Sequence, residues 1–128
     1  MSLRTPLGRV LGMGSAQQGV QHWWSQRLTA LALVPLSVWF VVSLLSLPSL
    51  DPATVRAWMG GSWTALLLIL LVLTAAWHSQ LGVRVIIEDY VHDAGARTLV
   101  LVSVLAAHLL VAAAGVLAVL RVACGAPA

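Results

Sequence analysis

Three long runs of apolar residues dominate the chain, at about residues 23–47, 62–88 and 97–121. Each run reaches or exceeds the ~20 residues that a helix needs to cross about 30 Å of hydrocarbon. Short stretches with Pro, Gly, Asp and Arg separate the runs. The pattern therefore predicts an all-α integral membrane protein with three transmembrane helices, forming a single membrane-anchor domain over residues 1–128.

The connection after the first run predicts one further helix, at about residues 51–59. Asp51 followed by Pro52 is typical of an N-cap and the first helical position. Gly60 and Gly61 interrupt the helix before the second apolar run begins. We expect this short helix to lie on the outer surface of the membrane.

The composition agrees with a membrane protein, because 60% of the residues are hydrophobic and only 9% are charged. The formal net charge is +3, but the arginines are scattered and form no basic run or recognition motif. We therefore expect no nucleic-acid partner. The lone Cys124 can form no internal disulfide, and we assign it no role.

The arginines instead predict the orientation of the chain. With the N-terminus in the cytoplasm and the C-terminus in the periplasm, most of them fall on or near the inner side, as the positive-inside bias requires; these are Arg4, Arg9, Arg27, Arg84 and Arg97, whereas Arg56 and Arg121 fall outside. We expect residues 1–21 to be a retained cytoplasmic tail, because the apolar run that follows is too long for a signal peptide.

Two histidines lie at membrane depth, where an ionisable side chain requires a partner or a function. His78 lies about 15 Å from the inner end of the second span, and His108 lies at a similar depth in the third. Imidazole is a common axial ligand of haem iron. The alternative for each residue is a histidine that only donates a hydrogen bond to a neighbouring helix.

The spacing around His78 favours a cofactor site. At about 100° per residue, Gly82, Val85 and Asp89 fall within about 40° of His78 and form one stripe along the helix. A glycine one turn from a ligand leaves room for a flat macrocycle, although Gly82 can also serve close helix packing.

Other polar residues mark the inner ends of the spans. Tyr90 can be an interfacial belt residue, or its phenol can donate a hydrogen bond to a quinone carbonyl beside the carboxyl group of Asp89. Quinone reduction takes up protons, so such a pocket needs donors near water. Arg27 is either a positive-inside anchor or a partner for a haem propionate.

Positions 78–91, His-Ser-Gln-Leu-Gly-Val-Arg-Val-Ile-Ile-Glu-Asp-Tyr-Val, resemble the His, Gly, Asp-Tyr pattern of the hydrophobic membrane anchor, or D subunit, of succinate dehydrogenase. Positions 22–30, His-Trp-Trp-Ser-Gln-Arg-Leu-Thr-Ala, resemble the Arg-x-Thr-Ala start of the first helix in the alphaproteobacterial and mitochondrial-like members.

The resemblance implies a role for each site residue. His78 would be an axial ligand of haem b, and the cytochrome b556 subunit would supply the other ligand. Tyr90 would bind ubiquinone, with Asp89 beside it, while Arg27 would lie near the haem propionates and Gly82 next to the haem.

The resemblance also implies the assembly, a succinate dehydrogenase of the bacterial inner membrane. FAD and iron-sulfur clusters would belong to the flavoprotein and iron-sulfur partner subunits, so this chain alone would catalyse nothing. Two alternatives remain open from the residues: a haem-free structural anchor, and a self-contained small cytochrome b with haem between His78 and His108.

Overall fold

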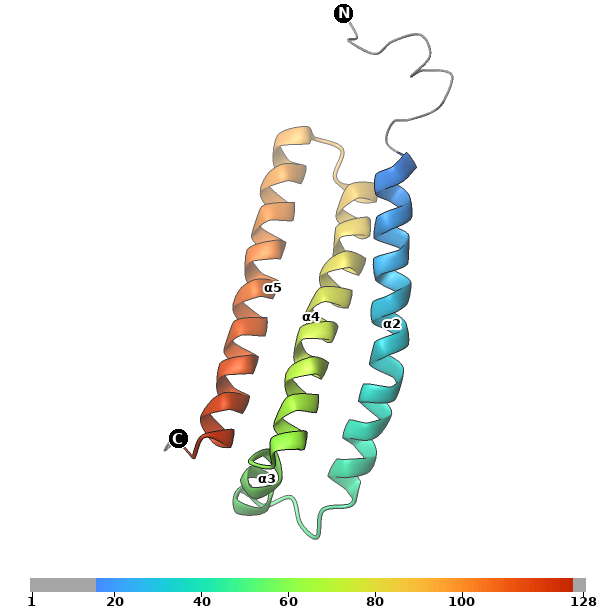
Figure 1. Cartoon of the computed structure of the whole chain (residues 1–128). Helices are drawn as coiled ribbons and strands as arrows, with labels where there is room; N and C mark the ends of the chain where they lie inside the picture. The colour runs from blue at the N-terminus through green and yellow to red at the C-terminus, as the bar shows by residue number, and fades with distance from the viewer. Residues whose placement is uncertain (1–15, 126–128) are drawn as a thin grey trace, which may run out of the picture.

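The structure is a computed structural model that describes residues 16–125. In chain order its helices are α2 (Ala16–Leu45), α3 (Pro52–Met59), α4 (Ser62–Tyr90) and α5 (Ala94–Ala123). The helices α2, α4 and α5 are long and apolar enough to cross a membrane (Figure 1). The predicted all-α fold with three spans is confirmed.

The ends of the helices differ from the predicted spans by several residues. α2 begins at Ala16, so the second part of the predicted tail is helical, and residues 1–15 lie outside the described chain. Hydropathy locates the segment that crosses the bilayer, whereas a helix continues through polar residues until a breaker ends it. α3 agrees closely with its prediction, since the Asp51 side chain accepts hydrogen bonds from the Ala53 and Thr54 amides.

The three long helices lie in a row with α4 in the middle (Figure 1). α4 contacts α2 on one side and α5 on the other, while within the described chain α2 and α5 do not contact each other. The C-terminal end of α4 lies at the same end of the molecule as the N-terminal ends of α2 and α5. We call this the Tyr90 end, and the opposite one the α3 end.

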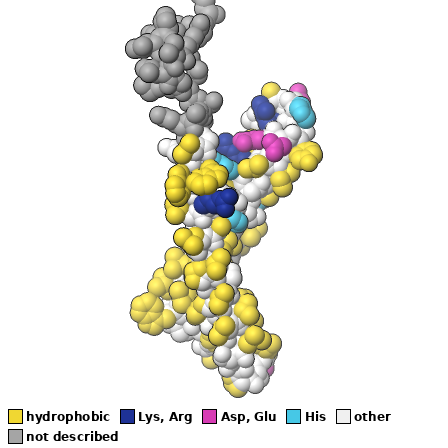
Figure 2. All heavy atoms as spheres, turned by 90° about the vertical axis from the view of Figure 1, so that its right-hand side faces the viewer, with side chains coloured by type: hydrophobic (Ala, Val, Ile, Leu, Met, Phe, Trp, Pro, Cys, Tyr) yellow, Lys and Arg dark blue, Asp and Glu magenta, His cyan; other side chains and the backbone are white. Residues whose placement is uncertain are grey.

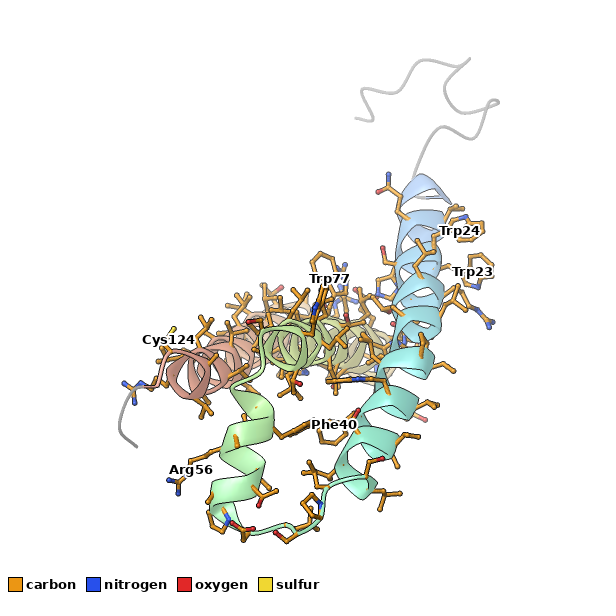
Figure 3. All side chains as sticks on the ribbon, turned by 60° about the horizontal axis from the view of Figure 1, so that its bottom comes forward. Trp23, Trp24, Phe40, Arg56, Trp77 and Cys124 are labelled. Atoms are coloured by element: carbon orange, nitrogen blue, oxygen red, sulfur yellow. The ribbon has the colours of Figure 1, made fainter. Side chains whose placement is uncertain are left out.

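Aromatic packing holds the row together at the α3 end. Trp58 of α3 stacks on Trp39 of α2 with ring centroids 6.2 Å apart. The Phe40 ring, which points from α2 toward α3 in Figure 3, is tilted against the Trp58 ring with its centroid also 6.2 Å away. These rings cover a small core formed by Ala65, Leu68 and Val119. α3 thereby connects α2 to the other two spans.

Small residues bring α4 and α5 close together. A Cβ atom built on Gly115 of α5 would lie 2.9 Å from Cγ1 of Val72 on α4, which is closer than carbon atoms approach without strain. Gly115 is therefore required for the α4–α5 contact, as small residues are at helix interfaces in lipid.

At the Tyr90 end, α2 diverges from α4 and α5, and Figure 2 shows an open notch between the two arms. Acidic, basic and histidine side chains gather on the arm formed by α4 and α5. α2 thus contacts α4 at the level of His78 and separates from it toward Tyr90.

Candidate functional site

His78 lies on the side of α4 that faces α2. Its Nδ1 atom is 3.0 Å from the Thr29 hydroxyl oxygen, and its Nε2 atom is 3.5 Å from the Gln26 side-chain nitrogen. The imidazole is half-buried. The structure therefore places this side chain against neighbouring protein, with polar atoms at both ring nitrogens.

Thr29 is itself bound to its own helix. Its hydroxyl oxygen lies 2.8 Å from the Ser25 carbonyl oxygen and 3.1 Å from that of Gln26. Threonine side chains in helices commonly donate to carbonyls three or four residues earlier. The contacts within α2 therefore fix the orientation of the Thr29 side chain independently of the imidazole.

Gly82 lies one turn from His78 and faces the Gln26 side chain. A Cβ atom built on Gly82 would lie 3.7 Å from the Gln26 side-chain nitrogen, an ordinary contact, and would meet no backbone of another helix within 4 Å. Gly82 is therefore not needed for α4 to approach its neighbours in this chain. The space beside it is covered only by one flexible amide, whose Oε1 atom is buried and has no hydrogen-bond partner among the described residues.

Asp89 and Tyr90 form the last turn of α4, and both side chains are exposed, Tyr90 to 79%. Nearby, the Arg84 guanidinium pairs with Glu88 at 2.8 Å along the same helix. The phenol and the Asp89 carboxyl group are thus free of contacts that would block a ligand. Neither side chain is enclosed by the described part of this chain.

Arg27 lies on another face of α2. Its guanidinium lies 5.4 Å from the Trp23 ring centroid, a cation–π contact. Trp23 and Trp24 project away from α4 in Figure 3. In this structure Arg27 contacts an interfacial aromatic residue and not the residues around His78.

His108 belongs to a different helix interface. Its Nδ1 atom lies 2.8 Å from the Val104 carbonyl oxygen, and its Nε2 atom lies 3.2 Å from the Ser79 hydroxyl of α4. Since Nδ1–H donates to the carbonyl, Nε2 accepts from the Ser79 hydroxyl. His78 therefore lies in the α2–α4 interface and His108 in the α4–α5 interface, and both nitrogens of His108 have partners within the chain.

Sequence reasoning overlooked Gln26 and Thr29 as partners of His78. Both residues are polar, interrupt an apolar helix and lie three positions apart, which puts them on one helix face. That spacing was a usable signal. The sequence did not reveal that α2 turns this face, and not the adjacent Arg27 face, toward α4.

The fold and the site define a class: small membrane proteins whose few intramembrane polar groups lie between helices. Within residues 16–125 no three His, Cys, Asp or Glu side chains cluster as a metal site. The polar side chains of the candidate site are therefore single groups and not a complete metal-binding set.

Comparison with known proteins identifies the family. The chain belongs to the family of succinate dehydrogenase/fumarate reductase transmembrane subunits, whose profile matches residues 1–117. It is similar to the succinate dehydrogenase hydrophobic membrane anchor subunit of Paracoccus denitrificans, with 31% identity over 95% of this chain and 94% of the relative. The same subunit of Rickettsia bellii is 30% identical over 79% of this chain and 81% of the relative.

These findings confirm the predicted resemblance. The chain is a membrane anchor subunit of succinate dehydrogenase, a non-catalytic part of an enzyme complex that operates with other subunits. Its spans and its Paracoccus and Rickettsia relatives agree with a multi-pass protein of a bacterial inner membrane.

Proposed function

We propose that this anchor subunit helps to hold haem b and ubiquinone, so that electrons from succinate oxidation reach the quinone pool. The observation that carries the proposal is the position of His78: the imidazole is held between α2 and α4, and its Nε2 atom faces the flexible Gln26 amide, which also lies against Gly82.

The residues present fit a haem. His78 supplies a nitrogen ligand suited to iron, and Gly82 leaves room beside it that a Cβ atom would fill. Displacing the Gln26 amide, whose Oε1 atom has no described partner, would open this space. When bound, haem b supplies a one-electron carrier within the membrane.

A second protein ligand for the iron would come from the cytochrome b556 subunit. His108 is unsuited to that role, because its side chain lies in the α4–α5 interface against Ser79, whereas His78 lies in the α2–α4 interface. Arg27 would leave the Trp23 ring to pair with a haem propionate, a movement that its long side chain allows.

The quinone would bind at the Tyr90 end. The exposed Tyr90 hydroxyl would donate a hydrogen bond to a quinone carbonyl, and the Asp89 carboxyl group beside it would pass protons toward that oxygen. Because neither residue is enclosed in this chain, the cytochrome b556 and iron-sulfur subunits would supply the other walls. The flavoprotein subunit would hold FAD, and the Tyr90 end would face the cytoplasm.

The haem proposal is tested by His78→Ala in the intact four-subunit complex. We expect the reduced-minus-oxidised b-type band to disappear, because the variant removes one of two axial ligands. His92→Ala, at an exposed histidine of the α4–α5 connection, is the matched control and should keep the band. A full band in His78→Ala would overturn the proposal.

A haem-free structural anchor is the second candidate, and one observation favours it. Both nitrogens of His78 have polar neighbours in this chain, so the imidazole can be satisfied without iron. The same difference spectrum decides between the two functions, because a structural anchor would show no b-type band in the wild-type complex.

The quinone proposal is tested by Tyr90→Phe, which keeps the ring and removes the hydroxyl. We expect succinate-to-ubiquinone turnover to fall by about a hundredfold or more, while succinate reduction of a soluble dye is unchanged. Asp89→Asn should also slow quinone reduction, whereas Glu88→Gln, its exposed neighbour, should not. Wild-type turnover in Tyr90→Phe would place the quinone elsewhere.

A further inference from the structure

The contacts of Thr29 determine which nitrogen of His78 carries the proton. The Thr29 oxygen lies 2.8 Å and 3.1 Å from two backbone carbonyl oxygens. Oxygen atoms this close repel each other unless a hydrogen lies between them, so the hydroxyl hydrogen must point toward these carbonyls. The Thr29 oxygen then meets His78 with lone pairs only.

His78 must therefore donate to Thr29. The Nδ1 atom, 3.0 Å from that oxygen, carries the hydrogen, and a neutral imidazole with Nδ1–H has its free lone pair on Nε2. This is the nitrogen that faces the Gln26 amide, which also lies against Gly82.

The Gln26 amide agrees with this assignment. Its NH₂ group, 3.5 Å from Nε2, is a donor directed at the free lone pair, while its Oε1 atom has no described partner. The contact is long, and Gln26 is a flexible side chain. The lone pair is therefore covered by a weak bond that an iron ion can replace.

We propose that Thr29 is the positioning residue for His78: its oxygen fixes the Nδ1–H tautomer and so turns the free Nε2 lone pair toward the space beside Gly82. This inference rests on the proposed haem site, and it assigns to Thr29 a function that this residue performs without touching the haem. Hydrogen bonds to the second nitrogen of a histidine ligand fix its orientation and raise its basicity. With haem bound, Thr29 would thereby stabilise the oxidised, more positively charged iron.

The experiment compares Thr29→Val with Thr29→Ser in the intact four-subunit complex. Valine keeps the shape and removes the acceptor oxygen, whereas serine keeps the hydroxyl. Thr98→Val is the matched control, because the exposed Thr98 hydroxyl also donates to a carbonyl four residues earlier, that of Ala94, on α5. The readouts are the haem content per complex and the midpoint potential of the b-type band.

We expect Thr29→Val to weaken haem retention by about 10- to 100-fold and to raise the midpoint potential, because a less basic ligand stabilises oxidised iron less well. Thr29→Ser and Thr98→Val should match the wild type. Wild-type haem content and potential in Thr29→Val would overturn the inference. If His78→Ala nevertheless loses its haem, the role of Thr29 is refuted while the proposal that His78 binds the haem still stands.

A second measurement applies if Thr29→Val fails to assemble. In the full chain in lipid bilayers with ¹⁵N-labelled histidine and no haem, the His78 signals are assigned by their absence in His78→Ala. We expect Nδ1 to be the protonated nitrogen. Protonation on Nε2 would overturn the inference whatever the complex binds.

Discussion

The same substitution at two glycines should have opposite effects. Gly82→Ala adds a methyl group that meets only the Gln26 amide, at 3.7 Å, whereas Gly115→Ala places it 2.9 Å from Cγ1 of Val72. Carbon atoms pack at about 3.5–4.0 Å, so the second contact is too short by about 0.6 Å or more. Val72 is β-branched and has one strongly preferred rotamer in a helix, so the backbones must move apart.

The magnitudes follow from these contacts. Overpacking lowers the free energy of unfolding by about 1–3 kcal/mol, whereas exchanging glycine for alanine in a helix raises it by up to about 1 kcal/mol. Gly115→Ala should therefore lose about 1 kcal/mol of unfolding free energy, while Gly82→Ala should gain up to about 1 kcal/mol. The difference of about 2 kcal/mol corresponds to roughly a 30-fold ratio in the folding equilibrium.

The assay is denaturant-induced unfolding of the chain in detergent micelles, followed by tryptophan fluorescence, together with the haem content of the complex. We expect Gly82→Ala to fold at least as stably as the wild type and still to lose haem, since its methyl group occupies the proposed space of the macrocycle. Gly115→Ala should unfold earlier. A Gly82→Ala variant that is destabilised as much as Gly115→Ala, or that keeps its full haem content, would refute the reasoning.

Three further predictions concern other parts of the chain. His108→Leu should keep the b-type band but cost about 0.6 kcal/mol of stability, the typical value of an interhelical hydrogen bond in lipid; loss of the band would support ligation within this chain. Trp58→Ala should cost about 1–3 kcal/mol, since each of its two aromatic pairs is worth about 0.5–1.5 kcal/mol, and an unchanged unfolding midpoint would contradict this. The Ser49 hydroxyl, then the Thr54 hydroxyl and amide, lower the pKa of Asp51 well below its usual value. The stability from this carboxylate is therefore present above pH ~4 and lost as the pH falls through the lowered pKa. The hydrogen-exchange protection factors of the first α3 amides, corrected for the intrinsic exchange rate at each pH, should fall on acidification in the wild type but not in Asp51→Asn.

The sequence was sufficient to predict the spans and the α3 cap. Apolar runs of more than 20 residues leave one structural solution in a bilayer, and Asp51 followed by Pro52 is a local signal that needs no tertiary contact. The start of α2 at Ala16 was not predicted, because hydropathy contains no information on how far a helix extends into polar sequence.

The candidate site was only partly predictable, because the sequence shows which residues share a face of one helix but not which face of the next helix they meet. Helical spacing puts Gly82 and Asp89 near the face of His78, whatever surrounds the helix. Which residues of α2 meet that face depends on the rotation of α2 about its own axis, and packing at the α3 end helps to set that rotation. The sequence therefore indicated Arg27, whereas the structure brings Thr29 and Gln26 to the imidazole.

His78 and Tyr90 lie on different faces of α4. Twelve residues at 100° per residue turn Tyr90 about 120° around the helix from His78 and move it about 18 Å along the axis. Since α2 covers the His78 face and Tyr90 is 79% exposed, the residues that surround the imidazole do not enclose the phenol. A quinone pocket at Tyr90 therefore requires walls from outside this chain, and we propose that the iron-sulfur and cytochrome b556 subunits supply them, as the family resemblance implies.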